Sequence, residues 1–220
     1  GVLTIIGIAV AATAIVIAFI VSTLDRDNEF GQPAVYSDQP TDSVCELGRV
    51  ALEGSIGDTP DAEWVEHRGA WLPISETYGP GEYQTDGEFS CFEHSPRGML
   101  FAASAYTGQL TNPSYWEETP DVFAGEYAEQ HRAEAEELFT TVFSEADTAL
   151  GGFRLVSYDG DTAQIDMAVT SFDGSETSRT SVLLDMIWAD GDWYIDATES
   201  ELAISLTPLP DLIGYQNWSA

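Results

Sequence analysis

The chain is 220 residues long, which is enough for one domain with a sizeable hydrophobic core and additional segments. It carries 38 acidic residues against 7 basic ones, all of them arginine, so its formal net charge is −31. Such a surface repels nucleic acid and anionic lipid headgroups, which argues against direct binding of DNA or RNA. Acidic residues spread this evenly along a chain are typical of a surface that keeps a protein soluble. A high-GC source, a halophilic source or an extracytoplasmic surface would each account for arginine without lysine.

The first segment predicts a membrane anchor. Residues 2–21 carry no charge, and about 20 apolar residues are enough to span a bilayer as a helix. The apolar core is longer than that of a secretory signal, and neither an A-x-A cleavage site nor a lipid-attachment cysteine follows closely, so an uncleaved helix over residues 1–24 is favoured. A stripe of small residues would admit a partner helix, although small residues are also common in other membrane helices. This stripe comprises Gly7, Ala11, Ala14 and Ala18.

The charge of the segment after the anchor predicts its orientation. Residues 25–30 are net acidic, whereas cytoplasmic flanks favour Lys and Arg, so we expect the N-terminus in the cytoplasm and the main domain outside the plasma membrane. The chain begins at Gly1, so we expect a cytoplasmic tail to precede it. Residues 25–60 are rich in Asp, Pro, Gly, Ser and Thr and predict an acidic linker or stalk. Within it, residues 44–52 predict a strand or helical turn that docks on the domain.

The chain has two cysteines, Cys45 and Cys91. Outside the cytoplasm two cysteines in one domain usually pair, which predicts a disulfide between them. This bridge would close a loop of about 45 residues and contribute roughly 3–4 kcal/mol in the chain-entropy model. Cys91 also lies three residues before His94, so a catalytic thiol–imidazole pair and half of a metal site are the alternatives. The disulfide is the preferred interpretation.

The folded domain is predicted over residues 61–200. Residues 63–75 indicate a short strand or extended arm, and Ser95 followed by Pro96 predicts the start of a helix. Residues 112–123 break this helix and include a short helix of their own. Residues 124–150 give the clearest helical pattern, which Gly151 and Gly152 end. Its stripe comprises Tyr127, His131, Ala135, Leu138 and Val142.

Beyond residue 152 the hydrophobic period changes to that of strands. Asp-Gly pairs at 159–160, 173–174 and 190–191 predict tight turns between three or four antiparallel strands. Residues 201–220 predict an extended C-terminal segment that packs on the domain or on a partner. Helices followed by an antiparallel meander predict an α+β domain, with the helices packed on one face of a curved sheet.

Two stretches of the chain resemble known proteins. The residues that carry the first motif are Trp64, Pro73, Ser75, Gly79, Pro80, Phe92, His94, Ser95, Pro96, Gly98, Ala102 and Ala103. This motif resembles a family of actinobacterial single-span membrane proteins. The second stretch, residues 153–197, is similar to the sheet of cystatin-like domains of the nuclear-transport-factor-2 type. Members of this family are similar to scaffold subunits of Gram-positive conjugation and secretion machines. The resemblance implies a protein–protein interaction module and no catalytic residues.

Other candidate sites have ordinary structural explanations. We expect His94 to bond the adjacent helix start or the surroundings of Cys91, His131 to be solvated or half-buried, and His67 to lie at the surface. Asp166 and Asp185 are a candidate carboxylate pair for proton transfer, but both alternate with apolar residues, so we expect them to face solvent. Asp-rich turns at 159–166 and 190–193 lack the full spacing of a calcium loop. We therefore expect no catalytic residue, cofactor or metal.

The sequence thus predicts a non-enzymatic subunit of a larger membrane complex, with integral membrane proteins and the bilayer as partners. Conjugation or secretion machinery is the candidate complex. The alternatives are an accessory subunit of a respiratory cytochrome bcc–oxidase supercomplex, and a small-molecule-binding or catalytic domain. Candidate interface anchors are aromatic, although core or lid positions would explain them equally well. They are Tyr115, Trp116, Tyr215 and Trp218.

Overall fold

The computed structural model describes residues 32–37, 47, 49–83, 89–118, 121–143 and 146–220. Pro33–Ala220 form one compact unit. The predicted anchor over residues 1–24, its stripe of small residues and Cys45 lie outside the described residues. Within the part that is described, no helix is long and apolar enough to cross a membrane.

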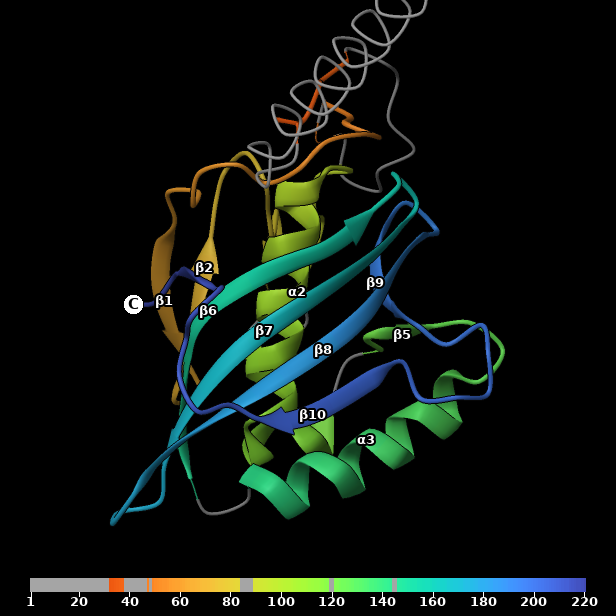
Figure 1. The fold of residues 1–220 in the computed structure, drawn as a ribbon. Coiled ribbons are helices and arrows are strands. Elements are labelled where there is room, and N and C mark those ends of the chain that lie inside the picture. Colours follow the sequence, from red (N-terminus) through yellow and green to blue (C-terminus); the bar gives the residue numbers. More distant parts are fainter. Residues whose placement is uncertain (1–31, 38–46, 48, 84–88, 119–120, 144–145) are drawn as a thin grey trace, which may run out of the picture. The chain divides into compact units, whose positions relative to one another are not determined.

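The described chain has an α+β structure, as predicted, in which an antiparallel sheet packs on a long helix, α2 (Figure 1). The strand order is β11–β6–β7–β8–β9–β5, and β10 pairs with β8. Only β5 runs parallel to its neighbour. The long strands are β6 (Asp147–Tyr158), β7 (Thr162–Phe172) and β8 (Thr177–Ala189). The short ones are β5 (Phe123–Ala124), β9 (Asp192–Asp196), β10 (Ile204–Pro208) and β11 (Gln216–Asn217).

Two hairpins accompany this sheet. The first pairs β1 (Glu63–His67) with β2 (Ala70–Ile74), and the second pairs β3 (Glu82–Tyr83) with β4 (Phe89–Ser90). The first hairpin confirms the extended structure predicted for residues 63–75. A 3-10 helix, η2 (Pro113–Glu118), follows α2 and confirms the short helix predicted there.

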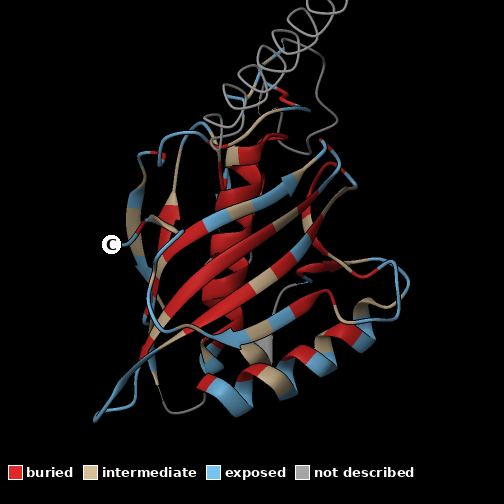
Figure 2. Ribbon diagram, viewed as in Figure 1, coloured by how far each residue is buried: buried red, intermediate tan, exposed pale blue. Residues whose placement is uncertain are grey.

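Helix α2 (Pro96–Leu110) forms the centre of the core, and its start is the one predicted. The Ser95 Oγ accepts a hydrogen bond from the Gly98 N–H, and Pro96 occupies the first turn, where its missing N–H costs nothing. Almost every residue of the helix is buried, because it lies between the sheet and β2 (Figure 2). A Cβ on Gly108 would lie 2.3 Å from Leu72 Cδ2, so glycine permits the close approach of β2.

The three predicted Asp-Gly turns join β6 to β7, β7 to β8 and β8 to β9. Gly160, Gly174 and Gly191 all have positive φ, a conformation that glycine adopts without steric cost. In β7 the predicted apolar set faces the core, and the strand pairs with β8 from Thr162 to Phe172. The core-facing residues are Ala163, Ile165, Met167 and Val169.

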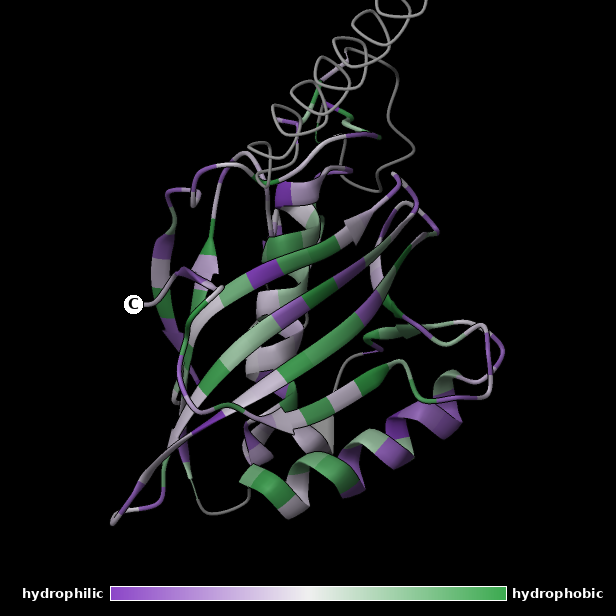
Figure 3. Cartoon of the chain, in the orientation of Figure 1, coloured by the Kyte–Doolittle hydropathy of each residue, from purple (hydrophilic) through white to green (hydrophobic). Residues whose placement is uncertain are grey.

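The second helix, α3 (Ala128–Phe143), is shorter than the predicted helix over residues 124–150. Residues 147–158 instead form β6, so Gly151 and Gly152 lie inside a strand and do not end a helix. Pairing with β7 outweighs the local helical pattern here, and a Cβ on Gly152 would lie 2.4 Å from the Gln216 carbonyl oxygen of β11. The outer side of α3 is hydrophilic along its first half (Figure 3).

The buried stripe of α3 also differs from the predicted one. Val142 is 44% exposed, whereas Phe139 and Phe143 are buried. The stripe repeats every four residues, which is the spacing of one helix face. It comprises His131, Ala135, Phe139 and Phe143.

The compact unit extends beyond the predicted domain at both ends. Val50, Ala51 and Ile56 are buried, so this part of the predicted linker packs on the domain. At the other end β10 and β11 both join the main sheet. Trp218 is 6% exposed, and its ring packs edge-on against Trp64, Phe101 and Phe153. The segment at 201–220 is therefore part of the fold.

We predict that Trp218→Ala lowers the free energy of unfolding by about 3–5 kcal/mol, because it leaves a cavity among three aromatic rings. It also removes the hydrogen bond that Trp218 Nε1 donates to the Pro60 carbonyl. The measurement is urea-induced unfolding followed by circular dichroism. Ile213→Ala is the control, because Ile213 is 84% exposed in the same segment and its loss should change stability by under about 0.5 kcal/mol. Equal effects of the two substitutions would contradict the placement of Trp218 in the core.

Candidate functional site: an acidic cavity beside α2 and β9

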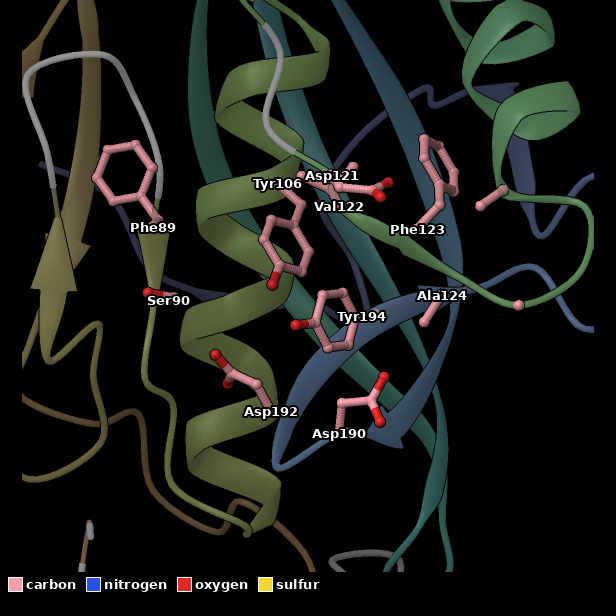
Figure 4. A pocket seen from close by; sticks show the side chains of 12 residues that line it. Phe89, Ser90, Tyr106, Asp121, Val122, Phe123, Ala124, Asp190, Asp192 and Tyr194 are labelled. Carbon is pink, nitrogen blue, oxygen red and sulfur yellow. The ribbon is translucent and has the colours of Figure 1, made fainter. Parts of the chain in front are cut away.

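A cavity of about 380 Å³ lies where α2, β4, β5 and β9 meet (Figure 4). Aromatic, acidic and small aliphatic residues line it. The aromatic residues are Phe89, Tyr106, Phe123 and Tyr194. The acidic residues are Asp121, Asp190 and Asp192, and none of the described residues that line the cavity is an arginine or a histidine. A volume in this range is typical of pockets that hold a small ligand or a large side chain.

Four elements position these walls. The Tyr106 hydroxyl of α2 donates a 2.6 Å hydrogen bond to the Trp193 carbonyl, which fixes the helix against β9. On the other side the Ile195 N–H donates to the Val122 carbonyl at 2.8 Å, which places β5 along β9. Asp190 has a φ of 50° in the turn from β8 to β9. Aspartate tolerates this left-handed conformation better than most residues, so the turn holds a carboxylate at the cavity.

Asp192 is the most buried of the three carboxylates, at 2% exposed. Its Oδ2 accepts a hydrogen bond from the Cys91 N–H at 2.6 Å, and its Oδ1 accepts from the N–H groups of Phe92 and Trp193, both at 2.9 Å. Burial raises the pKa of this carboxyl above its ordinary value, although the three hydrogen bonds oppose the shift. Asp192 therefore fastens the loop before α2 to the sheet.

The other two carboxylates are exposed and give the cavity its negative charge. Asp121 lies 3.5 Å from the Arg132 Nη2 of α3, an exposed ion pair of small energetic value. Among the described residues no cation forms a salt bridge with Asp190 or Asp192. The described chain contains no cluster of side chains suited to a metal ion. The arrangement is suited to a positively charged group that carries apolar surface.

The thiol–imidazole alternative receives no support from the geometry. Cys91 is 1% exposed, and none of the described cysteines carries a free thiol. Cys45 lies outside the described residues, so the bridge between the two stays a prediction. The His94 ring stacks on Trp188 at 3.9 Å, and its Nε2 lies 2.9 Å from the Gly160 carbonyl oxygen, which accepts its hydrogen bond. His94 thus joins the helix start to the turn between β6 and β7.

The other two histidines are more buried than predicted. His131 is 0% exposed, packs edge-on against Phe123, and has no hydrogen-bond partner on either ring nitrogen among the described atoms. The prediction that His131 is solvated or half-buried was wrong, because the face of α3 that carries His131 packs against β5. His67 is half-buried, and its Nδ1 lies 2.6 Å from the Tyr115 hydroxyl, which in turn donates to the His67 carbonyl.

The candidate carboxylate pair, Asp166 and Asp185, does not line this cavity. Asp166 and Asp185 both lie on the face of the sheet opposite the core, as predicted, but Asp166 is only 2% exposed. Its expected exposure was wrong because the C-terminal segment covers it, with the Tyr215 hydroxyl donating to Asp166 Oδ2 at 2.7 Å. Arg154 pairs with the same oxygen at 2.7 Å, and Ser181 donates to the other. Asp185 is exposed and accepts a hydrogen bond from Gln164.

Two of the four candidate interface residues are core residues. Tyr115 is 0% exposed and Trp218 is 6% exposed, so neither presents a surface to a partner. The turn of η2 directs Tyr115 inward, where its hydroxyl reaches β1. Trp116 and Tyr215 are half-buried. The aromatic spacing could not separate these cases, because anchors and core aromatics have the same composition.

The cavity itself was not predicted. The only local signal was the Asp-Gly-Asp-Trp sequence at 190–193, which indicated a turn and an incomplete calcium loop. The partners of Asp192 lie about 100 residues earlier in the chain, at Cys91 and Phe92. No periodicity links positions so far apart.

Another buried carboxylate, that of Glu93, lies just before α2 and is 1% exposed. The Ser95 hydroxyl donates to it at 2.7 Å, and Arg49 Nε lies 3.5 Å away. Burial raises the pKa of Glu93 above its ordinary value of 4.5, and the contacts with Ser95 and Arg49 offset part of this shift. The folded state therefore takes up a proton at a higher pH than the unfolded state.

We predict that Asp192→Asn lowers the free energy of unfolding by about 1–3 kcal/mol, because an amide nitrogen would then face a backbone N–H donor. Urea unfolding measures the change. Asp190→Asn is the matched control: it removes the same charge two residues away, and asparagine also tolerates positive φ. If both variants unfold at the wild-type urea concentration, the three hydrogen bonds of Asp192 do not hold the loop.

We also predict that Glu93 makes stability depend on pH. A raised folded-state pKa gives stability that is present below 4.5 and is lost as the pH rises through the folded value. The melting temperature should therefore rise between pH 7 and pH 5 more steeply in the wild type than in Glu93→Gln, as measured by calorimetry. The comparison of slopes removes the contribution of the other carboxylates, which both proteins share. Parallel slopes would show that Glu93 does not take up this proton.

Comparison with known proteins places the chain in a family. The sequence matches, over residues 25–217, the family described as Domain of unknown function (DUF8175). No curated protein and no solved structure matches the chain. The matched region includes the residues before 61 and the strands β10 and β11, in agreement with the extent of the compact unit. Because the match covers most of its 220 residues, the chain belongs to the DUF8175 family.

Proposed function

We propose that this chain is a non-enzymatic subunit of a larger membrane complex, and that its α+β domain binds a partner protein. The observation that carries the proposal is the acidic and aromatic cavity. Its one buried carboxylate, that of Asp192, accepts hydrogen bonds from three backbone N–H groups. A general base needs a carboxylate that can approach and release a proton of the substrate. A carboxylate held in this way acts as a fixed charged wall, so the geometry favours binding over catalysis.

The finer fold assignment is also part of the proposal: the domain is of the cystatin-like, nuclear-transport-factor-2 type. Two observations support it. A long helix, α2, packs on one face of an antiparallel sheet. In β6 the pairing register shifts between Leu150 and Gly152 and again between Leu155 and Ser157. Such bulges bend a strand and allow a sheet to curve around a helix.

The proposed location of the chain in the cell rests on its sequence. The apolar residues 2–21 anchor the chain in the plasma membrane, the domain lies on the extracytoplasmic side, and Cys45 and Cys91 form a disulfide there. The resemblance to scaffold subunits makes an actinobacterial conjugation or secretion machine the first candidate complex. A respiratory supercomplex is the alternative.

A small-molecule-binding role is the second candidate function. The cavity volume of about 380 Å³ favours it, because it falls in the usual range for ligand pockets. A catalytic role based on Asp166 and Asp185 receives no support, since Asp166 is covered by Tyr215 and paired with Arg154.

We predict that the tagged full-length chain, purified from membranes in a mild detergent, recovers integral membrane proteins in stoichiometric amounts. Mass spectrometry identifies them. Channel and ATPase components would assign the chain to conjugation or secretion, and cytochrome and oxidase subunits to a respiratory assembly. The control is the same chain with residues 1–24 replaced by an unrelated apolar helix, which separates partners bound by the domain from those bound by the anchor. A chain that elutes alone and monodisperse would contradict the proposal.

A further inference from the structure

The cavity beside α2 and β9 has an unmatched negative charge. Of its three carboxylates only Asp121 has a basic partner, Arg132, and that contact is exposed. Asp190 and Asp192 have no salt-bridge partner in the described chain. Within the described part of the chain, backbone N–H groups and no cation accompany the buried carboxylate of Asp192.

Asp192 also has acceptor capacity to spare. An ionised carboxylate offers about four lone-pair sites, and the three N–H donors use two on Oδ1 and one on Oδ2. One site on Oδ2 remains, on a residue that is only 2% exposed and lines the cavity. This lone-pair site can accept one more hydrogen bond, and a charged donor would bind it most strongly.

The remaining walls suit a cation with a planar, weakly hydrated head and an apolar stem. Tyr106 and Tyr194 present aromatic rings to the cavity (Figure 4). Val122, Ala124 and Ala128 form an apolar wall. A guanidinium group stacks on aromatic rings and pairs with carboxylates, while its methylene stem packs on apolar surface. An ammonium group is a compact, strongly hydrated charge and uses such walls less well.

We propose that this cavity binds a single arginine side chain of a partner polypeptide. This inference rests on the proposed function, because it names the chemistry by which the domain would recognise its partner. The net charge of −31 favours the same class of partner, since a strongly acidic surface attracts basic segments and speeds their association.

The test is a titration of the full-length chain in detergent micelles, with methyl-labelled alanine and valine, followed by nuclear magnetic resonance. The probe is N-acetyl-arginine methylamide, and the matched probe is the citrulline analogue, which has the same shape without the charge. We expect saturable shifts at Val122, Ala124 and Ala128, and none at Val156, which is 50% exposed outside the cavity. The citrulline probe should bind at least about tenfold more weakly. Equal binding of the two probes would overturn the proposal, as would equal shifts at Val156.

Two double variants separate the cavity from the general acidity of the surface. Asp121→Asn with Asp190→Asn removes two cavity charges at exposed positions and should weaken arginine binding at least about fivefold. Glu199→Gln with Glu201→Gln removes the same charge at exposed positions that do not line the cavity, and should leave binding unchanged. Equal weakening in both would show that the probe responds only to net charge, and the proposal would fail.

The same cavity variant in the affinity purification distinguishes the two proposals. Loss of partners from the Asp121→Asn, Asp190→Asn chain, with full recovery by the wild type, supports the arginine site. Full recovery by both chains overturns the arginine site and leaves the proposed function intact. If the wild type recovers no partner while the cavity still binds the arginine probe, the proposed function fails and arginine binding by the cavity stands.

Discussion

The burial of α2 on all sides is the constraint on which the rest of the structure depends. A helix that lies between a sheet and a hairpin needs small residues at the points where its neighbours approach closely. A Cβ on Gly98 would lie 1.9 Å from the Glu93 carbonyl oxygen, and one on Gly108 would lie 2.3 Å from Leu72. Ser104 is buried in this helix, and its hydroxyl donates to the Leu100 carbonyl one turn earlier. The small residues of this segment are therefore a packing requirement.

The start of α2 is held by polar contacts with strands that come about 100 residues later. Asp192 accepts the N–H groups of Cys91 and Phe92, and Trp193 Nε1 donates to the Glu93 carbonyl at 3.1 Å. The stack of His94 on Trp188 adds an aromatic contact between the same two regions. These contacts fix the distance between α2 and β9, and that distance sets the width of the cavity. The residues that stabilise the fold thus also shape the candidate binding site.

The C-terminal segment covers Asp166 on the opposite face of the sheet. It pairs with β8 through β10 and with β6 through β11, and between them Tyr215 bonds the buried Asp166. Arg154 lies 5.0 Å from the Tyr215 ring centre and pairs with the same carboxylate, so charge and aromatic contacts act together. Trp218 then returns to the core. The acidic cavity lies away from this segment, at β9, where Asp190 and Asp192 line it.

Local chemistry in the sequence determined several elements. The Ser95-Pro96 start of α2, the Asp-Gly turns and the alternation in β7 each depend on residues only a few positions apart, so the pattern alone predicts them. Only the tertiary structure decided the end of α3, where pairing with β7 turns residues 147–158 into a strand despite their helical pattern. It also decided that Asp166 and Tyr115 are buried, because the segments that cover them are distant in sequence. The tertiary structure also decided the cavity, because the residues that bond Asp192 are distant from it in sequence. A local sequence pattern does not predict which distant segment a strand contacts.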